Sequence, residues 1–264
     1  MTILPASRTP TIAVRVVVLV LALAIPMGVG VWNRLAAGKA GERPTPTATG
    51  GERLILPTVR TTPDPSYSYL ATQPGSLEPV AFDPCRPIHY VVRPTGAPPD
   101  GTTLLTEAIN RISAATGLQF INDGATDEAP LPARPNFLPD RHGDRWAPVL
   151  VAWSTPGEFA TLTGPVIGIA TNRPVDVEDG VMAFVSGQVV LDTPQMSELL
   201  QYNGGRSLTV AALTHELGHL VGLAHVQDTR QLMYPSARPL VTNLGRGDLT
   251  GLAALGTGRC FAEL

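Results

Sequence analysis

The chain has 264 residues, and 44% of them are hydrophobic, which is enough for one domain with a buried core. Its formal net charge is −3, so the sequence lacks the excess of positive charge that attracts nucleic acids and other polyanions. We therefore expect no nucleic-acid partner.

An uncharged apolar segment, residues 16–32, follows Arg8 and Arg15 near the N-terminus. Its length lies between the apolar centre of a secretory signal and the about 20 residues of a membrane-spanning helix. Residues 1–33 are therefore expected to be a signal-anchor, the interpretation we prefer, or a cleaved signal peptide. The first alternative gives a single-pass protein of the cell membrane with its globular part extracellular. The second gives a secreted protein, with residues 1–40 removed.

Residues 34–80 are rich in proline, threonine, glycine and serine. Such a composition buries too little apolar surface to fold, so the sequence predicts a disordered, extended linker here. The short apolar run at residues 54–56 is the exception, and it is suited to docking on a neighbouring surface. The composition becomes globular at residue 81, and the expected folded domain is residues 81–264.

The domain alternates strand and helix patterns. A proline-rich stretch at residues 123–147 predicts a long surface loop before the most apolar strand. This order predicts an α+β (α/β-like) fold, with a mixed, twisted sheet and helices on one side. The predicted strands are residues 88–92, 118–121, 149–153, 166–170 and part of 181–191, and the predicted helices are residues 102–116, 207–221 and 248–255.

Three histidines and a glutamate lie within the eleven residues from His215 to His225. On a helix, His215 and His219 lie one turn apart on the same face, so two ring nitrogens can reach one metal ion. Gly222 allows the chain to turn there and bring His225 back to the same place. Three nitrogens with an open fourth position is the stoichiometry of catalytic zinc. The carboxylate of Glu216 is placed to reach a water on that metal.

A short loop with Met233, followed by Tyr234 and Pro235, comes after the third histidine. With this loop and the three histidines, the chain resembles the metzincin zinc endopeptidases. The Leu-Met-Tyr-Pro run, and Val226 directly after His225, are more similar to the matrixin branch than to the astacin or adamalysin branches. Only one of the 19 basic residues is lysine, a bias that indicates a bacterial, high-GC coding sequence.

The resemblance implies a metzincin-type fold with a zinc-binding active-site helix, a Met-turn and a C-terminal helix. It implies a zinc-dependent metalloendopeptidase that hydrolyses peptide bonds of protein substrates outside the membrane, through a zinc-bound water with Glu216 as general base. Met233 is then expected beneath the metal without coordinating it, and Tyr234 and Pro235 in the wall of the substrate pocket. The expected cofactor is one catalytic Zn²⁺, the expected partner is a protein or peptide substrate, and the expected state is a monomer.

Two other functions fit the same pattern. One is a catalytically inactive, membrane-anchored binding module that keeps the fold, although such a module has no need of Glu216. The other is a zinc hydrolase of a non-peptide substrate, which the sequence leaves open.

Two further groups resemble metal sites less closely. The His142-Gly143-Asp144 run is similar to part of a structural-zinc loop, but it precedes the central strand and lacks partner histidines. Asp176, Glu178 and Asp179 are suited to Ca²⁺, but a solvated acidic loop is the interpretation we prefer.

Cys85 and Cys260 are the only two cysteines, and they bracket the expected domain. In an exported protein they admit one intramolecular disulfide. In the alternative, Cys85 binds the zinc and keeps the enzyme latent, which leaves Cys260 as a free thiol. We prefer the disulfide, because Cys85 lies only three residues before the first predicted strand and has little slack to reach the cleft.

Overall fold

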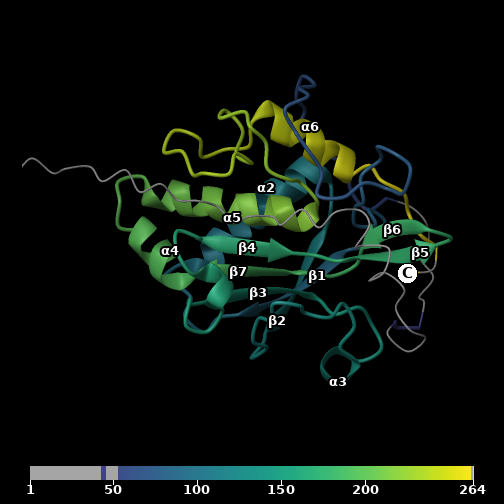
Figure 1. Ribbon diagram of the computed structural model, residues 1–264, viewed down its shortest axis with the longest axis horizontal. Helices are drawn as coiled ribbons and strands as arrows, with labels where there is room; N and C mark the ends of the chain where they lie inside the picture. The colour runs from purple at the N-terminus through teal and green to yellow at the C-terminus, as the bar shows by residue number, and fades with distance from the viewer. Residues whose placement is uncertain (1–42, 46–52, 263) are drawn as a thin grey trace, which may run out of the picture.

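A computed structural model of the chain describes residues 43–45, 53–262 and 264 (Figure 1). The expected anchor or signal segment, residues 1–33, lies outside the described residues. In the described part of the chain, no helix combines the length and apolar character needed to cross a membrane.

A five-stranded mixed sheet with the strand order β2-β1-β3-β7-β4 forms the centre of the fold. The first four strands in this order run parallel, and β4 is antiparallel to β7 at the edge. Two more strands, β5 and β6, form a separate hairpin. The strands are β1 (Ile88–Arg93), β2 (Phe120–Ala125), β3 (Val149–Ser154), β4 (Gly168–Thr171), β5 (Pro174–Glu178), β6 (Val181–Phe184) and β7 (Gln188–Asp192).

The helices α2, α5 and α6 lie on one side of the sheet, and the loop that carries α3 lies on the other (Figure 1). The mixed, twisted sheet with helices on one side confirms the expected α+β class. The helices are α2 (Gly101–Thr116), α3 (Pro139–His142), η1 (Ala160–Leu162, a 3₁₀ turn), α4 (Thr193–Leu199), α5 (Gly205–Val221) and α6 (Arg246–Leu255).

The two central strands and α5 are the most buried elements. Every residue of β3 and β7 is buried, which explains why β3 has a continuous apolar sequence instead of an alternating one. Helix α5 packs against α2, α4, α6 and the strands β4 and β7. A helix enclosed in this way gives its polar side chains fixed surroundings.

The short helix α4 is not among the elements that the sequence predicts. Its start is nevertheless a standard cap, since the Asp192 carboxylate accepts a hydrogen bond of 2.7 Å from the Gln195 backbone N–H. The strand pattern at residues 181–191 is divided between β6 and β7, which are separated by residues 185–187.

Residues 53–80, which we call the strap, pack against the domain instead of forming the disordered linker that their composition predicts. Backbone hydrogen bonds join the strap to Pro84, Ala114 and Gly222. The prediction is wrong for these residues because composition does not reveal backbone partners that are distant in the sequence. Prolines also restrict the unfolded chain, so that an extended segment loses less entropy when it docks.

The structure joins Cys85 to Cys260 in a disulfide, as the preferred alternative predicts, with Cα atoms 5.5 Å apart. Asp83 ties the same two segments together, because its carboxylate accepts hydrogen bonds from the backbone N–H groups of Cys85 at 2.7 Å and of Phe261 at 3.1 Å. The alternative in which Cys85 binds the zinc needs a free Cys85 thiolate, whereas the Cys85 sulfur is in the disulfide here.

Loss of the disulfide is expected to destabilise the fold. The bridge spans 175 residues, and closing so long a loop in the unfolded chain stabilises the native state by on the order of 5 kcal/mol. Urea unfolding of Cys260→Ser tests this, with Cys85→Ser/Cys260→Ser as a control without a free thiol. Equal unfolding free energies for the oxidised parent and both variants would contradict it.

Candidate metal centre

The first two histidines of the predicted group lie on consecutive turns of α5, and both are buried. The helix ends at Gly222, which has φ 124°, a backbone conformation that favours glycine. A Cβ at Gly222 would also lie only 2.9 Å from Leu255 Cδ2. The chain then turns back through residues 222–225, here called the return loop, and so delivers His225.

The three side chains meet at their Nε2 atoms. His225 Nε2 lies 3.1 Å from the Nε2 atoms of both His215 and His219. Zn–N bonds of about 2.0–2.1 Å in a tetrahedron place ligand nitrogens about 3.3 Å apart, so this spacing fits one zinc ion.

Backbone carbonyls determine the tautomers of two histidines. His215 Nδ1 donates to Leu232 O and His219 Nδ1 donates to Leu223 O, both at 2.7 Å. A carbonyl only accepts hydrogen bonds, so each Nδ1 carries the proton and each Nε2 presents a lone pair. This arrangement is typical of histidines that bind a metal.

Burial keeps these histidines neutral. It lowers the pKa of His225 to about 4 and, together with the neighbouring His225, lowers the pKa of His219 to about 3. The pKa of His215 lies well below its usual value for the same reason. A metal requires neutral imidazole, so the site is ready to bind a cation without first losing protons.

Glu216 lies on α5 beside the histidines and is fully buried. Neither carboxylate oxygen has a hydrogen bond of normal geometry in the described part of the chain. Burial raises the pKa of Glu216 to about 8, although the Ala170 backbone partly opposes this shift. A buried carboxylate whose oxygens lack hydrogen-bond partners fits a site where a cation or a water molecule supplies the missing contacts.

The edge strand β4 runs past this carboxylate. A Cβ at Gly168 would lie 2.8 Å from Glu216 Cγ, so a larger residue at that position would displace the glutamate. Glycine here allows the close approach between strand and helix.

The loop at residues 226–235, here called the methionine loop, packs beneath the helix. Met233 is buried, and a Cβ at Gly218 would lie 2.8 Å from its sulfur atom. Val226 N–H donates to Met233 O at 3.1 Å, which closes the loop behind His225. Tyr234 and Pro235 follow at half-buried positions, and Arg238 lies over the Tyr234 ring.

Asp248 is a supporting residue that the sequence analysis does not single out. Its carboxylate accepts backbone hydrogen bonds from Leu232 at 2.6 Å, from Met233 at 3.3 Å and from Gly245 at 2.8 Å. Burial raises its pKa to about 6 in spite of these donors. An acidic residue at the third position of a helix is a known capping signal. The sequence therefore indicates that Asp248 caps α6, but it does not reveal that the same carboxylate binds backbone N–H groups of the methionine loop.

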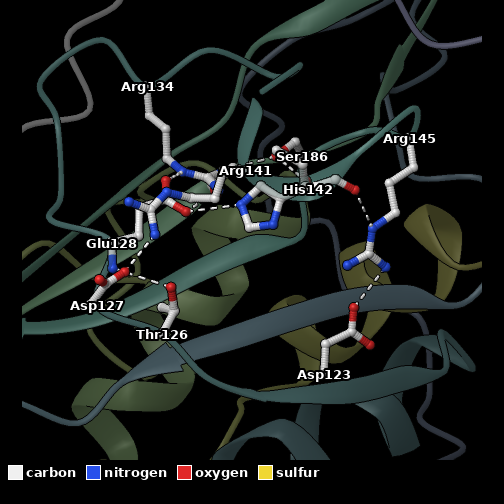
Figure 2. Close-up of polar contacts among 11 residues, drawn as sticks. Asp123, Thr126, Asp127, Glu128, Arg134, Arg141, His142, Arg145 and Ser186 are labelled. Carbon is white, nitrogen blue, oxygen red and sulfur yellow. Dashed lines mark hydrogen bonds and ion pairs between the residues drawn. The ribbon is translucent and has the colours of Figure 1, made fainter. Parts of the chain in front are cut away.

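His142 belongs to a separate buried ion cluster on the other side of the sheet (Figure 2). Its Nε2 lies 3.0 Å from Glu128 Oε2, and Arg134 donates to both oxygens of Glu128 and to Ser186 Oγ. Burial alone would raise the pKa of Glu128, but Arg134 and then His142 outweigh it and lower the pKa. The cluster fastens the long loop to the β6–β7 connection, and His142 is occupied there.

Two acidic residues of the β5–β6 hairpin, Asp176 and Glu178, bind different partners and do not converge on one point. Asp176 accepts from Gly180 N–H at 3.2 Å, and Glu178 pairs with Arg259 at 3.3 Å. Within the described residues, the only convergent sets of three possible metal ligands are the histidine group and Asp83 with the two disulfide cysteines. The histidine group is therefore the one set with free ligand atoms.

A protein-family model described as matrixin matches residues 171–255. This range includes α5, the three histidines, the Met233 loop and α6, and it is less than half of the chain. The match identifies a zinc metallopeptidase. It confirms the expected resemblance to matrixins over this range and zinc as the expected cofactor.

Among solved structures, archaemetzincin from Methanopyrus kandleri is similar to this chain at 18% sequence identity. The similarity covers 62% of this chain and 92% of that one, with a TM-score of 0.38. No curated protein matches the chain.

The chain is expected to bind one zinc ion through the three histidines. Protons compete for the same nitrogens, and the pKa values of about 3 for His219 and about 4 for His225 mean that zinc should stay bound well below pH 6. It should be lost only as the pH falls below about 4. Metal analysis across a pH series measures this, with His89→Ala as a control outside the site. An unchanged stoichiometry in His219→Ala/His225→Ala would refute it.

Proposed function

We propose that this zinc metallopeptidase is an endopeptidase that cuts protein substrates outside the membrane, with Glu216 as the general base. The observation that supports this most directly is the buried Glu216 carboxylate beside three convergent Nε2 atoms and an edge strand. A metal site that serves only for binding has no need of such a carboxylate.

His215, His219 and His225 would hold the zinc ion, which would supply Lewis acidity to a water molecule and to the scissile carbonyl. Glu216 takes the proton from the attacking water, holds it in a site shielded from solvent, and passes it to the leaving amine. Burial raises the pKa of this carboxyl to about 8, so it accepts a proton more readily than an exposed glutamate does.

An extended peptide is the substrate form that the sheet edge favours. In the described sheet β4 is the last strand, with β7 on one side only. A peptide can add to such an edge through main-chain hydrogen bonds. Gly168 of β4 lies against Glu216, so a peptide on this edge would pass close to the base.

We propose that three further residues have the roles expected from the sequence. Met233 lies under α5 and forms an apolar floor that supports the histidines without coordinating the metal. Tyr234 and Pro235 directly follow it at half-buried positions suited to the wall of the pocket for the residue after the cut.

Replacing the base should abolish cleavage but leave the metal in place. Glu216→Gln is expected to lower peptidase activity by a factor of about 10² to 10⁴, with unchanged zinc content. Digestion of an unfolded protein and of a random peptide library by the full-length chain measures this, with Glu198→Gln on the exposed face of α4 as the matched control. Cleavage at close to the parent rate would exclude Glu216 as the base.

The same assay separates the alternative functions. If the zinc-loaded parent cleaves no peptide but hydrolyses small esters or amides, the proposal gives way to a hydrolase of non-peptide substrates. If it cleaves neither, an inactive binding module is the better description.

We also propose that the folded part lies outside the membrane as a monomer, either tethered by residues 1–33 or released. The apolar N-terminal segment supports export, and the Cys85–Cys260 disulfide suits an oxidising compartment.

Protease treatment of intact cells tests the location. The folded part should be degraded while a cytoplasmic marker protein stays intact, because only the exported part is accessible. Protection of the folded part until the cells are lysed would place it on the other side of the membrane.

A further inference from the structure

We propose that residues 66–70 of the strap position the third zinc ligand, His225, so that the catalytic unit begins upstream of residue 81. The inference rests on the proposed zinc site but concerns a segment outside the matched range. Residues 66–70 would then have a specific role, although the composition of this segment predicts a linker.

The strap pairs with the return loop in the manner of a short antiparallel strand. Leu70 N–H donates to Gly222 O at 2.9 Å, and Ala224 N–H donates to Ser68 O at 2.8 Å. Tyr69 and Leu223 form the antiparallel bridge between these two bonds. The strap therefore holds the three residues that separate the end of α5 from His225.

The same three residues also support the second ligand. Leu223 O accepts the hydrogen bond from His219 Nδ1 at 2.7 Å, which fixes the His219 ring. Gly222 and Leu223 are buried while the strap is in place, so the Gly222 carbonyl depends on the strap for its hydrogen-bond partner. Displacement of the strap would loosen His219 and His225 together.

Helix α6 receives the strap on two glycines that lie one turn apart. A Cβ at Gly247 would clash with Ser66 O, and a Cβ at Gly251 would lie 3.0 Å from Tyr67 Cβ and 2.8 Å from Leu223 Cδ2. Glycine inside a helix is unfavourable unless close packing requires it. The two glycines thus indicate that the strap is a built-in part of the fold.

Further bonds fix the strap on both sides of this contact. Asp64 N–H donates to Thr250 Oγ1 at 3.1 Å. Beyond the contact, the Gln73 side chain donates to Met182 O at 2.8 Å and accepts from Met182 N–H at 2.9 Å. Asp64 and Gln73 are thus the two anchors of the strap, and the residues between them are held against the return loop.

The main test removes one donor from the strap. Leu70→Pro lacks the N–H that reaches Gly222 O. The matched control Thr58→Pro lacks the strap N–H that reaches Ala114 O on α2, a bond outside the anchored segment and away from the return loop. Zinc affinity is measured on full-length proteins by competition with a chromophoric chelator. We expect Leu70→Pro to bind zinc about ten-fold more weakly or worse, as is typical when groups that orient metal ligands are lost. Thr58→Pro should keep the parent affinity.

A second measurement separates positioning from general stability. In Leu70→Pro, hydrogen exchange of the backbone amides at residues 223–226 should accelerate, while that of β3 and β7 stays slow. A strap that only stabilises the fold would lower the unfolding temperature of both variants and leave zinc affinity and local exchange unchanged. That result would overturn the proposal.

A conservative pair covers the case in which Leu70→Pro does not fold. Tyr69→Ala removes the ring that packs on the core beside Tyr67, and Tyr69→Phe keeps it. Weak zinc binding in the alanine variant with rescue by phenylalanine supports positioning. Failure of both Leu70→Pro and Tyr69→Ala to fold even with zinc shows that the strap is only structural. A parent chain that binds zinc but cuts no peptide would refute the proposed function and leave this inference intact.

Discussion

The convergence of three neutral imidazole nitrogens on one point is the constraint on which the rest of the structure depends. His225 Nε2 lies 3.1 Å from each of the other two Nε2 atoms, and lone pairs at this distance repel one another unless a cation lies between them. Two carbonyls, Leu223 O and Leu232 O, hold the rings against that repulsion. These two carbonyls are in turn fixed by other parts of the chain.

Each of the two carbonyls is held in place by a different part of the chain. The Leu223 peptide lies between the two hydrogen bonds from the strap, and the Leu232 N–H donates to the buried carboxylate of Asp248 on α6. Helix α6 also carries the two glycines against which the strap packs. The strap, the return loop, the methionine loop and α6 therefore form one connected scaffold around the histidines, although they are distant in sequence.

The sequence predicts the parts of this arrangement that depend on local spacing. The four-residue interval between His215 and His219, the glycine at the helix end and the apolar run of β3 each express a periodicity or a turn preference. The disulfide is the one intramolecular pairing that two cysteines admit, and the position of Cys85 close to the first strand favours it over zinc binding. The supports of the site are not predictable in this way. Nothing in the composition of residues 53–80 indicates a backbone partner in the return loop, and an aspartate near a helix start does not reveal which N–H groups it binds. The Glu128–Arg134–His142 cluster likewise depends on a fold that brings two loops together.

The path of the strap limits where this chain can be processed. A cut upstream of Asp64 leaves every strap bond to α6 and the return loop in place, so the truncated enzyme would keep its metal. A cut between Leu70 and Gln73 separates the two anchors and frees the segment that lies against the return loop. The disulfide would still retain the rest of the fold, because it joins Cys85 to Cys260 independently of the strap. Cuts a few residues apart in one proline-rich stretch would therefore have opposite effects, since one leaves the metal site intact and the other disrupts it.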